Sequence, residues 1–368
     1  MGTEFQIVTL LKQICNKGVS DVHFRVGKPP SLRMGANIVK TNLEPLTDED
    51  FESIMKEIVR KENQERILGM TNFDFVYELP GVSRFRVNYC KDLGMPKLTM
   101  RLVPLQIPTI DELGLPSAIK ELTTLNNGIL MVTGPTGSGK STTLASIIDT
   151  INENYQKHIV TIEDPVEFMY TDKKSLMTQR SLGIDVDTFT SGIKYALRQD
   201  PDVILVGEIR DRDTMENAMA AAETGHLVLA TIHTNSAVQT INRIINLFDE
   251  STRVLAAERI AGCLRATIAQ KLITKIDGGR APAIEIMTVT STVKDYILKR
   301  NFDEIYNVMR RGEYNNMKTM NASIFELYDM GKITKETALA FSDDKTELSQ
   351  MMSGVYHGTT KKIKEKIV

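Results

Sequence analysis

The chain has 368 residues, of which 42% are hydrophobic and 25% charged, and its net charge is −2. This length exceeds one typical core and predicts two domains, and the near-neutral charge argues against a nucleic-acid-binding protein. The three cysteines, Cys15, Cys90 and Cys263, form no C-x-x-C pair, so neither a zinc site nor a disulfide framework is expected. No secretory signal and no apolar run of about 20 residues is visible, so we expect a cytoplasmic protein without a transmembrane segment.

The first hundred residues alternate between helical and strand-like periodicity. In chain order they predict an amphipathic helix, a strand, a polar helical stretch and three further strands, at 5–17, 22–26, 47–69, 73–79, 83–89 and 97–103. Residues 1–103 are therefore expected to form an N-terminal α+β domain. Pro104 and Pro108 then break the periodicity. Because proline lacks a donor and keeps its predecessor extended, 104–111 is predicted to be a linker.

From residue 112 onward, apolar strand patterns alternate with helical ones. The predicted strands are at 128–133, 158–162, 203–206 and 227–232, and the predicted helices are at 141–152, 189–198, 212–224 and 252–267. This alternation indicates an α/β domain of three layers with a largely parallel sheet, over 112–368. After about residue 290 the pattern is helical, and the basic tail at 361–366 is expected to be a solvated chain end.

Residues 134–141 read Gly-Pro-Thr-Gly-Ser-Gly-Lys-Ser and fit the phosphate-binding loop pattern G-x-x-x-x-G-K-[ST]. The backbone N–H groups of such a loop wrap a chain of phosphates, Lys140 would reach the β- and γ-phosphates, and the Ser141 hydroxyl would ligate Mg²⁺. An apolar strand pattern precedes the loop and a helical pattern follows it, which is the context that the motif requires.

Two predicted strands end in acidic residues. Glu163 and Asp164 follow one apolar run, and Glu208 follows another in the form of a Walker B strand. Ligands of open α/β sheets bind beyond the carboxyl ends of the strands. There a carboxylate such as Glu163 can deprotonate the water that attacks the γ-phosphate, and Glu208 can hold Mg²⁺, partly through water. The alternative is an ordinary strand end with solvent-facing acids.

His226 and His233 flank the strand predicted at 227–232. A spacing of seven places them at opposite ends of that strand, so a shared metal site is not expected. His233 lies at the carboxyl end, where it could hydrogen-bond to the γ-phosphate. Taken alone, each is more typical of a satisfied core histidine.

Three arginines, Arg84, Arg86 and Arg101, lie on predicted strands of the N-terminal domain. Arg84 and Arg86 share a face because side chains alternate along a strand. They are either solvated edge-strand residues or an arginine finger that reaches the nucleotide across a domain or subunit boundary.

Together these motifs resemble the secretion ATPases of type II secretion and type IV pili (the GspE/PilB/PilT family), above all the PilT-like retraction ATPases. The segments that carry the resemblance extend over nearly the whole chain, at 20–24, 27–30, 83–88, 101–104, 134–142, 161–167, 200–211, 225–237 and 264–272. The resemblance implies a PAS-like N-terminal domain, a RecA-like P-loop ATPase domain and a helical C-terminal region.

It also implies roles for residues. Glu163 corresponds to the catalytic base, with Glu208, His233, Arg86 and Arg101 also in the catalytic set. The residues implied to bind ATP are Gly134, Pro135, Thr136, Gly137, Ser138, Gly139, Lys140, Ser141 and Thr142. Ser141 and Glu208 would hold Mg²⁺.

The resemblance further implies a homo-hexamer at the cytoplasmic face of the inner membrane that acts on a PilC-like platform protein and powers pilus retraction. The chain carries neither an additional N-terminal domain nor a four-cysteine zinc site, which favours retraction over assembly or type II secretion. However, the retraction signature Ala-Ile-Arg-Asn-Leu-Ile-Arg-Glu is not intact, and 305–314 departs from it. A PilU-like accessory ATPase that works with a paralogous motor, or a weakly hydrolysing nucleotide-binding coupler, therefore remains an alternative.

Overall fold

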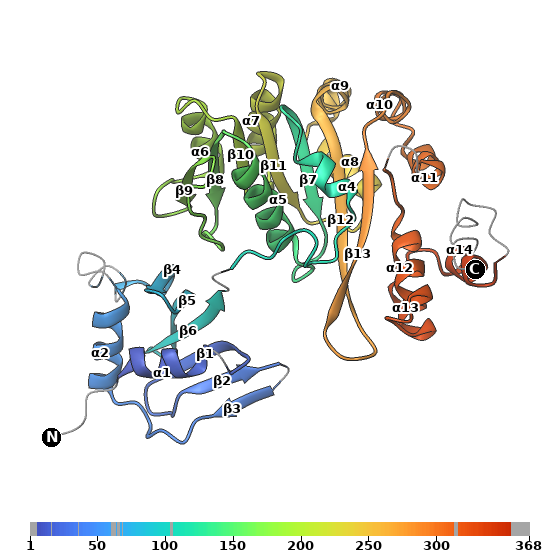
Figure 1. The fold of residues 1–368 in the computed structure, drawn as a ribbon. Helices are drawn as coiled ribbons and strands as arrows, with labels where there is room; N and C mark the ends of the chain where they lie inside the picture. The colour runs from blue at the N-terminus through green and yellow to red at the C-terminus, as the bar shows by residue number, and fades with distance from the viewer. Residues whose placement is uncertain are drawn as a thin grey trace. The chain divides into compact units, whose positions relative to one another are not determined.

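The computed structural model describes residues 6–354, except 16, 36, 60–63, 65–66, 68, 104–105 and 313–315 (Figure 1). The basic tail and part of the predicted linker lie outside these residues. By internal contacts the chain divides into two compact units, one comprising Met1–Gln106 with Glu167–Met169, the other Ile107–Val166 with Tyr170–Val368.

The described residues of the smaller unit form a six-stranded antiparallel sheet that packs against helices α1 and α2. The strands follow the order β3-β2-β1-β6-β5-β4. Their bounds are β1 Val19–Arg25, β2 Ser31–Met34, β3 Asn37–Lys40, β4 Asn72–Leu79, β5 Ser83–Asp92 and β6 Met95–Val103, and the helices are α1 Ile7–Ile14 and α2 Asp48–Ile58. Alternate residues such as Phe85 and Val87 are buried in one core with α1 and α2. Thr47 and Asp50 form a capping box that begins α2.

The larger unit contains a seven-stranded sheet in the order β13-β12-β7-β11-β10-β8-β9. All neighbouring strands are parallel except β12 and β13, which are antiparallel. The strand bounds are β7 Gly128–Thr133, β8 His158–Glu163, β9 Leu176–Ser181, β10 Val203–Val206, β11 Leu227–Ile232, β12 Leu264–Thr274 and β13 Arg280–Thr288. The mostly parallel α/β fold predicted for this part of the chain is confirmed.

Helices pack on this sheet and continue beyond it. Their bounds are α4 Ala118–Leu122, α5 Lys140–Asn154, α6 Phe189–Ala196, α7 Arg212–Glu223, α8 Ala237–Ile245, α9 Arg253–Cys263, α10 Ser291–Leu298, α11 Phe302–Arg311, α12 Met320–Asp329, α13 Lys335–Phe341 and α14 Lys345–Met352. One apolar cluster joins β7, β8, β10 and β11 to α6–α11. A second cluster joins β12 and β13 to α12–α14, and Figure 1 shows α12 and α13 beside the edge strand β13.

The helix predicted at 252–267 is wrong in its second part, because α9 ends at Cys263 and β12 begins at Leu264. β12 lies between β7 and β13 and is mostly buried. A strand buried on both faces lacks the alternation that distinguishes it from a helix. Strands β2, β3, β9 and β13 were not predicted either. By contrast, the strands predicted at 128–133, 203–206 and 227–232 and the helices after about 290 are confirmed.

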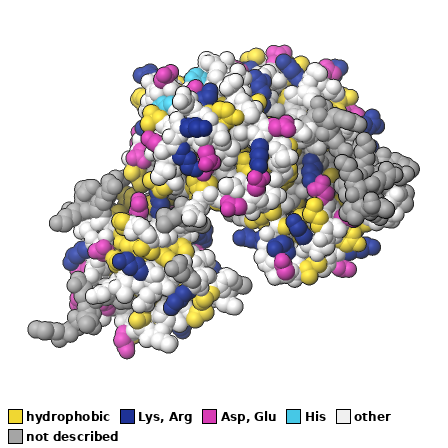
Figure 2. Space-filling view, viewed as in Figure 1, with side chains coloured by type: hydrophobic (Ala, Val, Ile, Leu, Met, Phe, Trp, Pro, Cys, Tyr) yellow, Lys and Arg dark blue, Asp and Glu magenta, His cyan; other side chains and the backbone are white. Residues whose placement is uncertain are grey.

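On the face displayed in Figure 2, basic and acidic side chains are interspersed rather than gathered by sign. Within the described part of the chain, no helix combines the length and the apolar character needed to cross a bilayer.

Candidate functional site

Four parallel strands bring the predicted site residues of the larger unit to one edge of its sheet. β7, β11, β10 and β8 are neighbours in that order. The phosphate loop follows β7, Glu163 ends β8, Glu208 lies just beyond β10, and His233 follows β11. Since the carboxyl ends of parallel strands share an edge, these four segments converge where open α/β sheets bind ligands.

The phosphate loop lies so close to β12 that side chains are excluded at two of its positions. A Cβ on Gly134 would lie 2.4 Å from the carbonyl oxygen of Gln270, and one on Gly139 would lie 2.8 Å from Gln270 Nε2. Both glycines also have positive φ, +149° and +89°, a conformation that side chains disfavour. The loop therefore requires glycine at these positions for two independent reasons.

Gln270 of β12 ties the loop to the helix that follows it. Its Nε2 donates to Ser138 O over 2.7 Å, and its Oε1 accepts from Thr143 Oγ1, also over 2.7 Å. The sequence placed Gln270 within a motif but gave it no separate role. The available signal was a polar residue in a run that is otherwise largely apolar.

Lys140 is the first residue of α5 and is 8% exposed. Its Nζ donates to the carbonyl oxygens of Gly134 (2.9 Å) and Pro135 (3.0 Å) and lies 3.5 Å from His233 Nδ1. Ser141 and Thr142 complete the first turn of α5. The lysine thus lies inside the loop that precedes it, beside the end of β11.

The loop and helix start have the donors that a phosphate chain needs. Gly139 is the N-cap of α5 and provides no side-chain cap, so no side chain there accepts from the first backbone N–H groups of the helix. The hydroxyls of Ser138 and Thr133 are buried and have no hydrogen-bond partner among the described residues. Helix N-termini and such hydroxyls favour anions, so these residues fit a nucleotide phosphate group.

Glu208 is held between two cationic or protonatable groups. Its Oε2 is 2.6 Å from Arg210 Nη2, and its Oε1 is 3.2 Å from His233 Nε2. Burial acts to raise the pKa of Glu208, but the Arg210 hydrogen bond and the charges of His233, Arg210 and Lys140 outweigh it and lower this pKa. Glu208 is therefore a carboxylate at neutral pH, and carboxylate oxygen suits Mg²⁺. The contact with Arg210 had not been predicted.

Glu163 and His226 occupy opposite edges of the sheet. Glu163 is the last residue of β8 and is 9% exposed, and Gly207 N donates to Ile162 O over 2.8 Å, which joins the end of β8 to the corner that carries Glu208. His226 precedes β11, and its Nδ1 lies 2.9 Å from Ala221 O. His226 and His233 flank opposite ends of β11, as predicted.

Arg86 and Arg101 belong to the smaller unit, where they are direct cross-strand partners on β5 and β6. Arg101 Nε donates to Asp21 Oδ1 over 2.8 Å, and Arg86 Nη1 lies 3.9 Å from Glu167 Oε1. Arg84 and Arg86 share a face, as predicted, because buried Phe85 between them points into the core.

A cavity of about 360 Å³ lies beside the phosphate loop. Besides residues 135–138 it is lined by Asn235 and Arg280, by Lys271 and Leu272, and by the segment 340–343. Lys271 Nζ donates to Phe341 O (3.1 Å) and to Asp343 Oδ1 (2.6 Å). The segment between α13 and α14 is thereby attached to β12 next to the loop.

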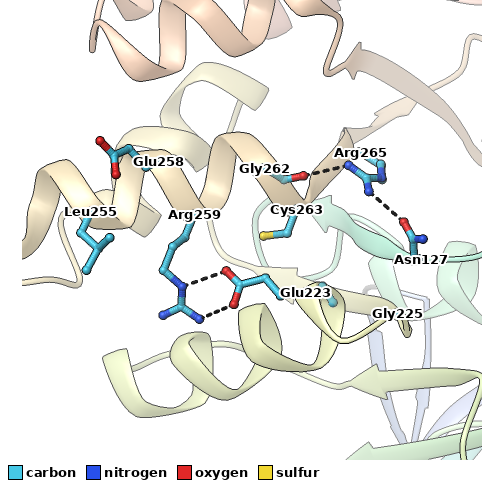
Figure 3. Close-up of a pocket in the computed structure, with 10 residues that line it drawn as sticks. Asn127, Glu223, Gly225, Leu255, Glu258, Arg259, Gly262, Cys263 and Arg265 are labelled. Carbon is cyan, nitrogen blue, oxygen red and sulfur yellow. Dashed lines mark hydrogen bonds and ion pairs between the residues drawn. The ribbon is translucent and has the colours of Figure 1, made fainter.

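A second cavity, of about 490 Å³, lies at the opposite edge of the sheet, where β7, β11 and β12 begin (Figure 3). Arg259 of α9 and Glu223 of α7 point toward one another and form two hydrogen bonds of 2.8 and 2.9 Å. Arg265 donates to Gly262 O and Asn127 Oδ1. Burial raises the pKa of the Cys263 thiol to about 12, so this cavity holds paired charges and an unreactive thiol.

Comparison with known proteins agrees with this geometry. Residues 81–329 match the family model described as type II/IV secretion system protein. The chain is 37% identical over 332 residues to the type IV pilus retraction ATPase PilT of Pseudomonas aeruginosa, which covers 90% of this chain and 96% of PilT. It is 35% identical over 344 residues to the type IV pilus ATPase PilU of the same organism, and the match covers 93% of this chain and 90% of PilU.

Comparison of the three-dimensional fold with solved structures indicates the same family. A crystal structure of the pilus retraction motor PilT with bound ADP matches with a TM-score of 0.88 and 38% identity, over 95% of this chain and 100% of that one. This match establishes a RecA-like ATPase domain and, with the family model, ATP hydrolysis. The chain belongs to the type II/IV secretion system family and, within it, to the PilT-like ATPases of type IV pili.

Proposed function

We propose that this chain is a hexameric motor that hydrolyses ATP to power type IV pilus retraction through an inner-membrane platform protein. The observation that carries the proposal is the convergence of the phosphate loop, Glu163, Glu208 and His233 at one sheet edge, in a chain that resembles PilT over nearly its full length. The motor would act at the cytoplasmic face of the inner membrane, and its N-terminal unit would be a PAS-like domain ending at the linker 104–111.

Within this proposal each residue has a defined task. Residues 134–142 bind the phosphates of ATP, and Ser141 and Glu208 hold Mg²⁺, which neutralises charge on the phosphates when bound. Glu163 takes the proton of the attacking water. His233 contacts both Lys140 and Glu208. It would therefore respond to the presence or loss of the γ-phosphate and transmit that change to the end of β11.

Arg86 and Arg101 are proposed to supply further positive charge to the nucleotide. Two arginines directly across an antiparallel pair repel one another. Arg101 pairs with Asp21 at 2.8 Å, whereas the pairing of Arg86 with Glu167 is longer, at 3.9 Å. An anion that both guanidinium groups could bind would remove that repulsion. Planar guanidinium groups are well suited to phosphate oxygens.

Deletion of the gene in its own host tests the cellular role. A retraction motor predicts excess surface pili and loss of twitching, restored by the wild-type gene but not by Lys140→Ala, which removes the lysine of the phosphate loop. Loss of surface pili in the deletion strain would contradict retraction and indicate pilus assembly. The Lys140→Ala protein must accumulate to wild-type level for the comparison to hold.

A second candidate is an accessory ATPase that works with a paralogous motor, as the similarity to PilU allows. The two candidates differ in what the isolated protein does. A retraction motor restores twitching in a host that lacks every other retraction ATPase, whereas an accessory ATPase restores it only together with the paralogue.

A further inference from the structure

The buried carboxylate of Glu285 lies between the two apolar clusters described above for the larger unit. Glu285 of β13 is 2% exposed. Its neighbours on the same face of the strand belong to different clusters, Ala283 to the one formed with α12–α14 and Met287 to the one formed with α6–α11. Burying an acid costs free energy unless its oxygens accept hydrogen bonds. The groups that donate to Glu285 therefore indicate what this residue does.

The two oxygens of Glu285 accept from the first residues of two different helices. Oε1 accepts from Ala237 N, the first residue of α8, over 2.7 Å. Oε2 accepts from Met320 N, the first residue of α12, over 3.2 Å. Both helices already have capping side chains, Ser236 and Thr319, which accept from later N–H groups. Glu285 therefore satisfies one further backbone donor in each helix and joins them to one another.

The α8 side of this joint leads directly to the nucleotide site. Only 234–236 separate His233 from the start of α8. This short segment is fixed at its helix end, since Thr234 Oγ1 lies 2.6 Å from Thr240 Oγ1, which in turn donates to Ser236 O over 2.8 Å. His233 is therefore held from two sides, by the end of β11 and by the first turn of α8, and a shift of that turn would change how His233 meets Glu208 and Lys140.

The α12 side leads into the C-terminal helices. The residues before α12 pair with β13 through Ile286 and Lys318, which exchange backbone hydrogen bonds of 2.8 and 2.9 Å. Met320 itself is buried in the cluster of α12–α14. A displacement of α12 would therefore move the Glu285 carboxylate, and the carboxylate in turn would move the start of α8.

We propose that Glu285 is a positioning residue that couples the C-terminal helix α12 to the His233 segment, so that the helical region sets the geometry of the nucleotide site. The inference rests on the proposed function, because it assumes that His233 acts on the nucleotide. Both carboxylate oxygens are needed. A glutamine of the same size offers one acceptor and turns a donor toward the second N–H, which disconnects one helix without creating a cavity.

The test compares Glu285→Gln with Ser323→Ala in the full-length protein. Ser323 Oγ accepts from Ile284 N over 2.8 Å and so joins the same strand to the same helix, next to Glu285 but on the α12 side. We expect Glu285→Gln to lower kcat by between about 10-fold and 100-fold, the effect of a small misplacement of a catalytic group, with KM for ATP and oligomeric state close to wild type. Ser323→Ala should keep wild-type kcat.

Hydrogen exchange gives a readout that does not depend on turnover. Backbone amides at 233–240 should exchange faster in Glu285→Gln than in the wild type, and those of β7 and β10 should not change. Wild-type kcat in Glu285→Gln, or an equal loss in Ser323→Ala, would overturn the coupling. If Glu285→Gln fails to fold, Glu285→Asp, which keeps the charge but is one methylene shorter, takes its place with the same two criteria. A wild-type protein without ATPase activity would instead contradict the proposed function.

Discussion

Gly207 allows the end of β8 to approach the Walker B corner, because a Cβ on Gly207 would lie 3.2 Å from Glu163 Cα and 3.2 Å from Ile162 O. Contacts this short force the backbone to shift by a few tenths of an ångström. Since both atoms belong to the backbone that carries Glu163, the shift would move the side chain of this proposed base.

Gly207→Ala is therefore expected to lower kcat at least tenfold, by moving Glu163 away from its working position, while the melting temperature falls by only a few degrees. Steady-state kinetics and thermal denaturation measure both. Gly262→Ala is the matched control, because a Cβ there meets no atom within 4 Å and alanine favours the helix. Unchanged turnover in Gly207→Ala would mean that the position of Glu163 tolerates this shift.

Glu163→Gln should bind ATP but hydrolyse it slowly. The amide keeps the shape of the side chain and loses the base, so kcat should fall by roughly 10²–10⁴-fold while the dissociation constant for ATP stays near wild type. Fluorescent-nucleotide titration and a phosphate-release assay separate the two quantities. Loss of binding together with turnover would assign Glu163 a structural role.

Arg86→Ala and Arg101→Ala should lower kcat although both residues lie outside the ATPase unit. An arginine that stabilises phosphoryl transfer contributes about 10³–10⁵ in rate, and lysine should replace it poorly because it lacks the planar fork. Light scattering must show that the variants assemble as the wild type does. Arg25→Ala is a suitable control, since Arg25 lies in the same sheet and pairs with Asp92. If the variants assemble and hydrolyse ATP at the wild-type rate, these arginines are solvated strand residues with no part in catalysis.

The stability of the protein should depend on pH through Glu285. Burial raises the pKa of this carboxyl from 4.5 to about 7, more than the hydrogen bonds from Ala237 and Met320 lower it. Asp343 and Lys271 act on it in opposite directions, and Tyr306 also lies within reach of its charge. Because the folded-state pKa lies above the unfolded one, the contribution of Glu285 to stability is full below about pH 4.5 and is lost as the pH rises to about 7.

Denaturant unfolding of the wild type and of Glu285→Gln at pH 5 and pH 8 isolates this contribution, since the amide does not titrate. The free energy of unfolding of the wild type should fall, relative to the variant, by on the order of a few kcal/mol between the two pH values. A constant difference between the two proteins would show that Glu285 has the same pKa in the folded and unfolded chain.

The central strands of the ATPase unit could be predicted because each is a short apolar run that ends at a motif. β7 ends at the phosphate loop and β10 at Gly207 and Glu208. The hairpin of β2 and β3 could not, since every residue of β3 is exposed and an exposed strand leaves no alternation of apolar and polar residues.

The same distinction applies to the site. Lys140, Glu163 and Glu208 could be proposed as site residues because each belongs to a motif that begins at or just after the end of an apolar strand in the sequence. Glu285 could not, because its partners Ala237 and Met320 are 48 and 35 residues away along the chain. Only the packed structure brings two helix starts to one side chain.

The position of α12–α14 at the end of the sheet has an evolutionary consequence. Their buried faces share a core with β12 and β13, so these faces and the contacts of Glu285 with Ala237 and Met320 are constrained. The outward faces carry no such constraint. After gene duplication, changes on those outward faces would give motors that hydrolyse ATP in the same way but bind different partners. Residues 320–354 could be exchanged between paralogous ATPases, and the rate of ATP hydrolysis and the cellular role of each chimera then measured. If this region selects the partner, the chimera takes the cellular role of the paralogue that donated it and keeps its own rate of hydrolysis.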